Sequence, residues 1–257
     1  LMELSPAEAI KNNVFGTRNL LESASAHGVE RLVQLSTDKA VNPTNVMGAT
    51  KRITEMLIQR YGEKTNMKCM AVRFGNVLGS HGSVIPLMES QIRKGGPVTV
   101  THPDITRYFM TIPEAAQLVL QAGGIARSAR SSCWTWASRC ASWIWPEADP
   151  CYGYEPNVDM PIKIIGLRPG EKLYEELLMD SSGQDDRTAH KKIFVANVDK
   201  IDDAQYDHMM QVLQTVEDER RARGGGDCEI VPTYHPDEKN RPDNKAGFAK
   251  NENQAAG

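Results

Sequence analysis

The chain has 257 residues, of which 40% are hydrophobic and 25% are charged, and its formal net charge is −3. A chain of this length and composition can bury a sizeable core as a soluble globular protein. Its charge gives no electrostatic reason to expect binding to nucleic acid or to an anionic membrane. No apolar run is long enough to span a bilayer, no signal peptide is expected, and the five cysteines form no CxxC pair.

The first third of the chain alternates helical and strand patterns. Ser5, Pro6 and Glu8 have the spacing of a helix start, with Ser5 as the cap and Glu8 completing a capping box. Gly28 then ends this helix. This alternation predicts a parallel α/β architecture. The expected elements are a helix over 5–27, a buried strand over 31–36, a helix over 49–61 and a buried strand over 69–74.

Further elements are expected beyond the glycine-bearing loop at 75–82. Thr111 and Glu114 have the spacing of a second capping box. The polar composition of residues 233–257 predicts a disordered tail. The expected elements are a helix over 84–93, a strand over 98–101, a helix over 111–122, a strand over 161–166 and a helix start over 172–178.

The segment 127–152 departs from the rest of the chain. All four tryptophans and three of the five cysteines fall between residues 133 and 151, and the segment has no helical or strand period. Its composition resembles a GC-rich gene read out of frame, and one choice of codons shifted by one base restores a strand and a turn. We therefore interpret 127–152 as an out-of-frame segment, with a genuine tryptophan-rich insertion as the alternative.

The first candidate site follows the expected strand over 31–36. The string Ser36-Thr37-Asp38-Lys39 ends this strand, and ligands of α/β sheets bind where strands end. Met47 and Lys51 lie one helical turn apart in the next helix, so they face the same way. Lys51 has the reach to contact a cofactor ribose. A solvated lysine on a helix surface is an equally good interpretation of the spacing alone.

Seven blocks in order then carry a resemblance. They are 13–22 (NVFGTRNLLE), 35–43 (LSTDKAVNP), 48–51 (GATK), 73–80 (RFGNVLGS), 82–86 (GSVIP), 106–114 (TRYFMTIPE) and 168–176 (RPGEKLYEE). Together they resemble the UDP-sugar 4,6-dehydratases of the bacterial polysaccharide-biosynthesis family, within the extended short-chain dehydrogenase/reductases. The resemblance covers roughly residues 3–195 without the anomalous segment.

The resemblance implies a fold and an activity. The fold would be a truncated Rossmann-type, doubly wound parallel sheet with a smaller C-terminal substrate lobe. The activity would be NAD-dependent 4,6-dehydration of a UDP-N-acetylhexosamine for capsule, O-antigen or other surface glycans. Residues 1–126 would hold the C-terminal half of the NAD-binding domain and the start of the substrate lobe, and 153–232 the rest of that lobe.

The resemblance also assigns residues. Thr37, Asp38 and Lys39 would act on the sugar, and Lys51 would serve both catalysis and the cofactor. Met47 stands in the slot of the usual tyrosine, and a thioether cannot act as a phenolate base. This points to the long membrane-attached forms, although a dead site is the alternative. Asn13 would contact the cofactor, and the substrate-binding residues would be Asn76, Ser83, Arg107, Arg168 and Glu171, with no metal site.

One expected part of such an enzyme is not in the sequence. No glycine-rich turn opens a βαβ unit, although such a turn binds the pyrophosphate of NAD. Because the chain starts at Leu1, we expect an upstream half to be missing and the chain to be inactive alone. The intact parent would be a cytoplasmic homo-oligomer, dimerising through 5–27 and 49–61 and attached to the inner membrane by a missing region. A non-catalytic remnant and a nucleotide-sugar epimerase or reductase are the alternatives.

Overall fold

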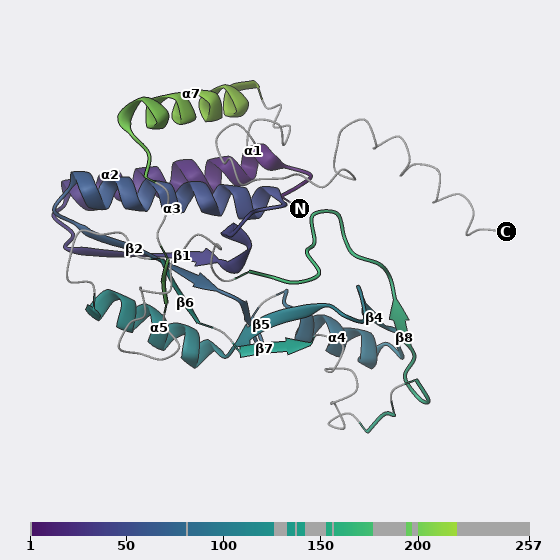
Figure 1. Ribbon diagram of the computed structural model, residues 1–257. Coiled ribbons are helices and arrows are strands. Elements are labelled where there is room, and N and C mark those ends of the chain that lie inside the picture. The colour runs from purple at the N-terminus through teal and green to yellow at the C-terminus, as the bar shows by residue number, and fades with distance from the viewer. Residues whose placement is uncertain are drawn as a thin grey trace.

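The computed structural model describes residues 2–80, 82–125, 133–136, 138–141, 153–155, 157–176, 194–196 and 200–219. It is an α/β structure with parallel strands, as the sequence predicts (Figure 1). The main sheet has the order β1-β2-β6-β9. Its strands are β1 (Arg31–Thr37), β2 (Lys68–Phe74), β6 (Cys133–Trp136) and β9 (Phe194–Ala196). The first three run parallel, and β9 is antiparallel to β6.

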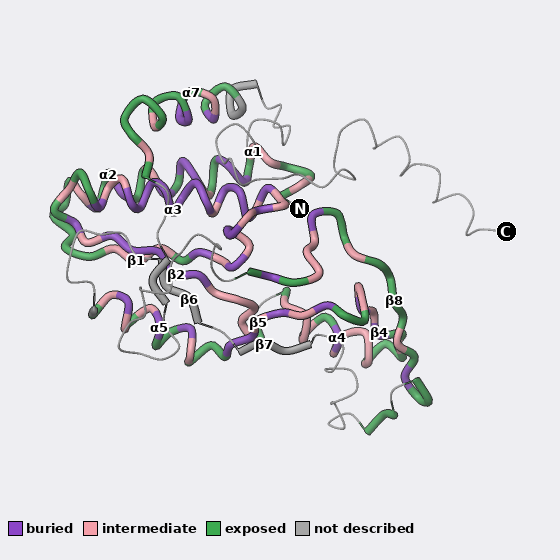
Figure 2. Tube along the Cα trace, in the orientation of Figure 1, coloured by how far each residue is buried: buried purple, intermediate pink, exposed green. Residues whose placement is uncertain are grey.

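Helices cover both faces of the main sheet (Figure 1). On one face lie a continuous helical stretch and α3 (Val46–Lys64), and on the other lies α5 (Ile112–Ile125). The stretch consists of α1 (Pro6–Ala9), the π-helical η1 (Ile10–Phe15) and α2 (Gly16–Ala26). Most of α3 is buried, which Figure 2 shows as an almost unbroken buried tube. The helix α7 (Asp203–Glu219), which the sequence pattern does not predict, packs through Met209, Met210 and Leu213 onto the core of this face.

Two small sheets extend the fold away from the main sheet. One has the order β3-β5-β7, with β3 (Asn76–Val77), β5 (Thr106–Met110) and β7 (Ser138–Ala141). The other pairs β4 (Val98–Val100) in parallel with β8 (Ile162–Ile164). Helix α4 (Val84–Arg93) packs beside β4, and Met88, Val98, Val100 and Met160 form a separate small core there. The predicted strands over 98–101 and 161–166 are confirmed in these positions.

Three expectations about local structure are wrong, and a fourth segment forms strands that its sequence pattern does not show. Ser5 makes no capping hydrogen bond, because its backbone (φ −143°, ψ 63°) lies outside the extended region that an N-cap needs. The helix that was expected to start at residue 172 does not form over Lys172–Glu176. Tyr174 instead forms an isolated β-bridge with Thr106 of β5. β1 is only partly buried, since among the described strands it pairs with β2 alone. Segment 127–152 has no strand period, yet β6 and β7 form there through backbone pairing with β2 and β5.

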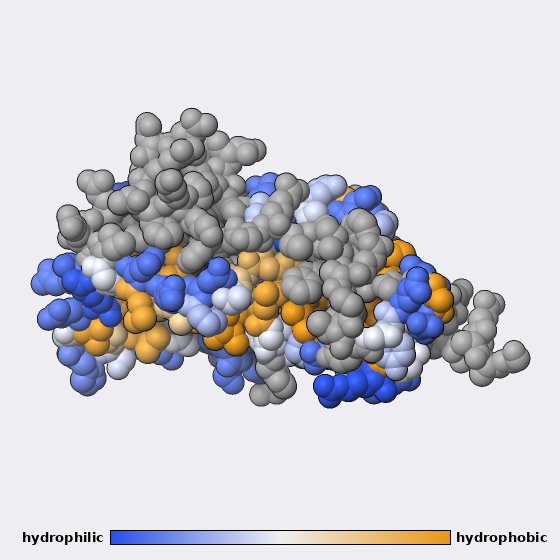
Figure 3. All heavy atoms as spheres, turned by 90° about the horizontal axis from the view of Figure 1, so that it is seen from below, coloured by the Kyte–Doolittle hydropathy of each residue, from blue (hydrophilic) through white to orange (hydrophobic). Residues whose placement is uncertain are grey.

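The rest of segment 127–152 lies outside the described residues, as does the predicted tail over 233–257. Within the part of the chain that the structure describes, no helix is long and apolar enough to cross a membrane. The face that carries α5 is seen in Figure 3, where hydrophobic residues gather in several patches among hydrophilic ones. Ile112 and Leu120 of α5 are among the exposed large hydrophobic residues.

Candidate active site

A pocket of about 590 Å³ lies where the main sheet meets the smaller sheets. One wall is polar and comes from the segment after β1 and from the start of α3, with Lys39, Asn45 and Met47. The facing segment, 168–175, contributes Arg168, Glu171 and Glu175, among others. The third wall is largely apolar and is lined by Val84, Leu87, Met88, Val100, Ile105 and Phe109.

The polar wall is built on the carboxyl end of β1. Asp38 begins the short 3-10 helix η2 (Asp38–Ala40) and is fully buried. Its Oδ1 accepts hydrogen bonds from the Thr37 hydroxyl at 3.0 Å and from the Lys39 ammonium at 2.9 Å. Its Oδ2 is enclosed without a partner among the described residues. The side chains of Thr37, Asp38 and Lys39 are thus joined by hydrogen bonds, but of the three only Lys39 lines the pocket.

Helix α3 lies very close to this strand end. Asn45 caps the helix by accepting a hydrogen bond from the Gly48 amide at 2.8 Å. A Cβ added at Gly48 would collide with the backbone carbonyl of Lys39, so only glycine allows the helix to approach the Lys39 backbone this closely. This approach brings Met47 to the pocket wall.

Lys51 points elsewhere. Its ammonium donates a hydrogen bond to the carbonyl oxygen of Leu35 in β1 at 3.1 Å, and it does not line the pocket. Burial lowers the pKa of Lys51, and the nearby Glu55 carboxylate opposes this effect. Asn13 also lies away from the pocket, where its amide donates to the Thr50 hydroxyl at 2.9 Å. The two residues expected to contact a cofactor therefore lie outside the pocket, Lys51 within α3 and Asn13 hydrogen-bonded to α3.

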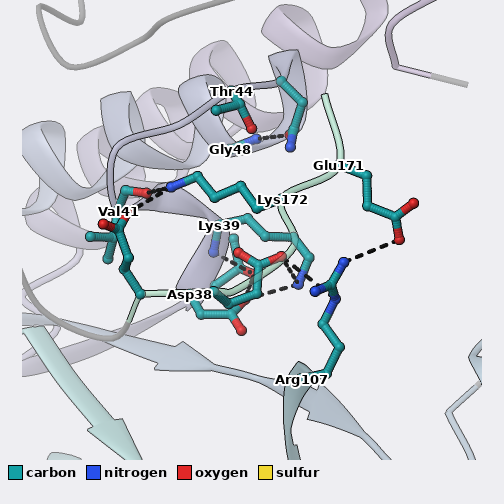
Figure 4. Close-up of polar contacts among 12 residues, drawn as sticks. Asp38, Lys39, Val41, Thr44, Gly48, Arg107, Glu171 and Lys172 are labelled. Atoms are coloured by element: carbon teal, nitrogen blue, oxygen red, sulfur yellow. Dashed lines mark hydrogen bonds and ion pairs between the residues drawn. The ribbon is translucent and has the colours of Figure 1, made fainter. Parts of the chain in front are cut away.

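Arg107 reaches from β5 toward the loop that carries Glu171 (Figure 4). Its guanidinium donates to Glu171 at 3.1 Å and to the backbone carbonyls of Thr106 and Leu173. Its Nε lies 3.8 Å from a carboxylate oxygen of Glu175. Arg107 lines the pocket but is only 7% exposed, so much of its hydrogen-bonding capacity is used within the protein.

Arg168 differs from Arg107 in its surroundings. It is exposed, lines the pocket and forms no ion pair with the described residues, so its guanidinium is available to an anionic ligand. Its backbone amide donates to Glu171 at 3.0 Å, which fixes the loop. The same loop is joined to the start of α3, because the Thr44 hydroxyl donates to the Gly170 carbonyl at 2.9 Å. Lys172 also reaches back to the Val41 carbonyl at 3.1 Å (Figure 4).

Of the two remaining residues expected to bind substrate, one lines the pocket and the other does not. Asn76 lines the pocket from β3. Ser83 precedes α4 without capping it through its side chain, and it does not line the pocket, although its neighbours Gly82 and Val84 do. Its hydroxyl is enclosed with no hydrogen-bond partner among the described residues.

Glu175 is a pocket residue that the sequence reasoning missed. Its side chain lies 3.7 Å from the Lys39 ammonium, although the two residues are far apart in the chain. The signal available was its place in the block 168–176, where three glutamates and two basic residues stand close together. No local pattern distinguishes which of these carboxylates is buried. Among the described residues there is no cluster of three metal-binding side chains.

The family model of the polysaccharide biosynthesis proteins matches residues 1–198. The probable polysaccharide biosynthesis protein EpsC of Bacillus subtilis is 53% identical over 190 residues, covering 69% of this chain and 30% of EpsC. The capsular polysaccharide biosynthesis protein CapD of Staphylococcus aureus is 50% identical over 200 residues, covering 77% of this chain and 33% of CapD. A UDP-glucose 4-epimerase of Rickettsia canadensis is 36% identical, covering 68% of this chain and 51% of the epimerase. The chain thus spans about a third of the length of the first two relatives.

Solved structures agree on the fold. Pen from Bacillus thuringiensis has a TM-score of 0.68 at 30% identity, covering 82% of this chain and 70% of that protein. A dTDP-glucose 4,6-dehydratase from Bacillus anthracis in complex with NAD has a TM-score of 0.53 at 17% identity, covering 60% and 56%. Such neighbours are nucleotide-sugar enzymes with a Rossmann-like fold. With 198 residues matched by the family model, the chain belongs to the polysaccharide biosynthesis protein family.

Proposed function

We propose that this chain supplies the sugar-reacting and nucleotide-binding walls of an NAD-dependent 4,6-dehydratase acting on a UDP-N-acetylhexosamine. The observation that carries the proposal is the pocket itself, with Lys39 on one wall, held by the buried Asp38 behind it, and on the facing segment Arg168, whose guanidinium forms no ion pair with the described residues. An amine beside a carboxylate suits proton transfer at a sugar carbon, and a free guanidinium suits a diphosphate. The capsular and polysaccharide roles named for CapD and EpsC support this substrate class.

Each wall of the pocket would bind a different part of the substrate. Arg168 would bind the diphosphate, and Arg107 would hold Glu171 in place beside it. The apolar wall formed by Val84, Leu87, Met88, Val100, Ile105 and Phe109 suits the flat face of a pyrimidine base. The sugar would then lie against Lys39 and Met47. In this arrangement C5 and C6 of the sugar would face Lys39.

In the proposed reaction Lys39, as the free amine, would take the proton from C5 and, as the ammonium so formed, would give that proton to the C6 hydroxyl, which leaves as water. Lys39 is the titratable group of the Thr37-Asp38-Lys39 string that lines the pocket, and Asp38 acts from behind it by holding the ammonium at 2.9 Å. Met47 has no ionisable proton, so it cannot take part in proton transfer. Thr37 fixes the Asp38 carboxylate by donating its hydroxyl proton at 3.0 Å.

The described residues fit NAD only in part. Lys51 is a half-buried amine whose pKa is lowered by burial, and it lies near the carboxyl end of β1, which is a suitable place for a ribose contact. The sequence holds no glycine-rich turn for the pyrophosphate, so those contacts would come from a further segment of the complete protein. When bound, NAD supplies the hydride chemistry at C4 and C6. By itself this chain is expected to show little or no turnover.

A UDP-sugar 4-epimerase is the second candidate, because the Rickettsia canadensis relative carries that name at 36% identity. Epimerisation needs hydride chemistry at C4 but no acid and base at C5 and C6. Dehydration would use Lys39, which Asp38 holds from behind, for the proton transfer at C5 and C6 that epimerisation lacks. A non-catalytic remnant is the third reading, which would apply if the segment 127–152 is out of frame in the gene itself.

The test is to incubate the complete protein, at the length of its relatives, with NAD and UDP-N-acetylglucosamine. The proposal predicts a nucleotide sugar that is lighter by one water. A product of unchanged mass with inverted C4 would favour the epimerase instead. No conversion by a folded protein that binds the substrate would favour the remnant. Sequencing the gene across codons 127–152 shows separately whether the reading frame is broken.

A further inference from the structure

The Glu175 carboxyl group is unusual among the acidic residues of this pocket. It is 8% exposed, and its Oε2 is enclosed without a hydrogen-bond partner among the described residues. Its Oε1 lies 3.7 Å from the Lys39 ammonium and 3.8 Å from Arg107 Nε. Burying a carboxylate costs free energy that two cations at this distance only partly offset. A hydrophobic residue would therefore be the better choice if packing were the only requirement.

Lys39 stands between two buried carboxylates that differ in their access to the pocket. Its ammonium lies 2.9 Å from Asp38, which is fully buried and does not line the pocket. Glu175 lines the pocket together with Lys39. The Lys39 side chain is partly exposed, at 23%, so its ammonium is held by protein on one side and open to a ligand on the other.

We propose that Glu175 is a positioning residue for Lys39, holding its ammonium at the pocket wall jointly with Asp38 and balancing the charge of Lys39 and Arg107. Asp38 and Lys39 come from the end of β1, Arg107 comes from β5, and Glu175 comes from the segment that follows β8. Glu175 thus connects the proton-transfer end of the pocket to the segment that carries Arg168 and Glu171. This role rests on the proposed function only in taking Lys39 as part of the reacting site.

The charges around Glu175 make the contact sensitive to pH. Burial raises the pKa of Glu175, Lys39 opposes this, Asp38 adds to it, and Arg107 and Lys172 oppose it, with a net rise. Glu175 therefore takes up a proton at higher pH than an exposed glutamate would. Protonation removes one of the two negative charges beside Lys39, and the ammonium is then held by Asp38 alone.

The chain itself can be tested by measuring how fast an amine reagent modifies Lys39 across a series of pH values. Peptide mass spectrometry gives the rate, with the exposed Lys11 in the same sample as reference. Glu175→Gln keeps the shape of the side chain and removes its charge. Glu176→Gln is the matched control, because the neighbouring Glu176 pairs with Lys172 at 2.7 Å and not with Lys39. Glu175→Asp keeps the carboxylate.

Glu175→Gln is expected to speed the modification of Lys39 by about three- to tenfold and to move its pH profile to lower pH, because losing a nearby negative charge leaves more of the lysine as free amine. Glu176→Gln should match the unchanged chain, and Glu175→Asp should lie closer to it than Glu175→Gln does. A Glu175→Gln profile that coincides with the unchanged chain would overturn the proposal. Equal acceleration in Glu175→Gln and Glu175→Asp would overturn it as well, since packing and not charge would then be the cause.

A calorimetric titration with UDP separates this inference from the proposed function. If the chain binds UDP and Lys39 does not respond to Glu175→Gln, Glu175 has no positioning role while the nucleotide pocket stands. If Lys39 responds but the chain does not bind UDP, Glu175 positions the lysine while the nucleotide assignment of the pocket is wrong. Circular dichroism of each variant checks that the fold is intact before rates are compared.

Discussion

Ser36 at the end of β1 donates its hydroxyl hydrogen bond to the carboxylate of Glu55 in α3, at 2.7 Å. The same carboxylate also accepts hydrogen bonds from Arg73 of β2 at 2.7 and 2.8 Å and from Arg52 at 3.1 Å. All four side chains are buried. This network joins β1 and β2 to the helix that carries Met47 and Lys51, directly behind Thr37 and Asp38. It therefore fixes the strand end on which the candidate site is built.

Replacing Glu55 by glutamine should destabilise the chain by about 3 to 5 kcal/mol near neutral pH, because two buried arginines lose their carboxylate. Burial raises the pKa of Glu55, but Arg73, Arg52 and Ser36 outweigh it and lower the pKa to about 2. A lowered folded-state pKa gives stability that is present above the usual value of 4.5 and is lost as the pH falls toward about 2. Urea unfolding of both proteins should show their difference narrowing over this range. A difference that stays constant would contradict the assigned pairing.

The start of α5 should depend on a reciprocal pair of contacts. The Thr111 amide donates to the Glu114 carboxylate at 2.7 Å, and the Glu114 amide donates to the Thr111 hydroxyl at 3.3 Å. Thr111→Ala removes the cap and is expected to lower the free energy of unfolding by about 1 kcal/mol. Thr111→Ser keeps the hydroxyl and should lose much less, as thermal unfolding can show. Equal losses in the two variants would mean that the threonine methyl group matters more than the cap.

The two arginines of the pocket should respond differently to truncation. Arg168→Ala removes an exposed guanidinium that forms no ion pair with the described residues, so it should weaken UDP affinity about tenfold or more with little effect on stability. Arg107→Ala removes the partner of Glu171 and a neighbour of Glu175, so it should lower the melting temperature as well. Calorimetric titration and thermal unfolding of both variants check this contrast. Full UDP affinity in Arg168→Ala would remove that residue from the diphosphate site.

The loop at 168–171 should depend on its hydrogen bond to Thr44. Thr44→Val keeps the shape of the side chain and removes the hydroxyl that donates to the Gly170 carbonyl. Since Asn45 also donates to this carbonyl, at a longer 3.3 Å, the loop should loosen without coming free. UDP affinity is expected to fall by about three- to tenfold, the effect of losing one hydrogen bond. Thr65→Val, in which the lost hydroxyl bonds at the far end of α3, serves as the control and should bind UDP normally.

The sequence predicts the structural features that are determined by contacts between residues close together in the chain. The capping box at Thr111 and Glu114 spans three residues, and the alternation of helices and strands over 5–74 follows from short apolar patterns. The capping box at Ser5 was wrong because the backbone conformation before a helix depends on what the chain packs against. β5, β6 and β7 could not be found from periodicity, because pairing between distant segments creates them.

The same limit applies to the site. The resemblance assigned Asp38, Lys39, Arg107 and Arg168 to the site. In the structure Lys39, Arg107 and Arg168 line one pocket, and Asp38 lies behind Lys39. Dimerisation through 5–27 and 49–61 stays a prediction, and α7 already covers part of the core between these helices. Glu175 could not be found, because its burial depends on the β5 contact across the chain. A charged residue in a charged run gives no local sign of such a contact.

The central claim is dehydration at C5 and C6, and the most direct test is the reaction of the complete protein with NAD and UDP-N-acetylglucosamine in deuterium oxide. The account predicts a 4-keto-6-deoxy product in which C5 carries deuterium taken from solvent and C6 carries the hydrogen that left C4. Nuclear magnetic resonance of the product locates both atoms. A C4 epimer that contains no deuterium would contradict the account, because its formation would involve no proton transfer at C5.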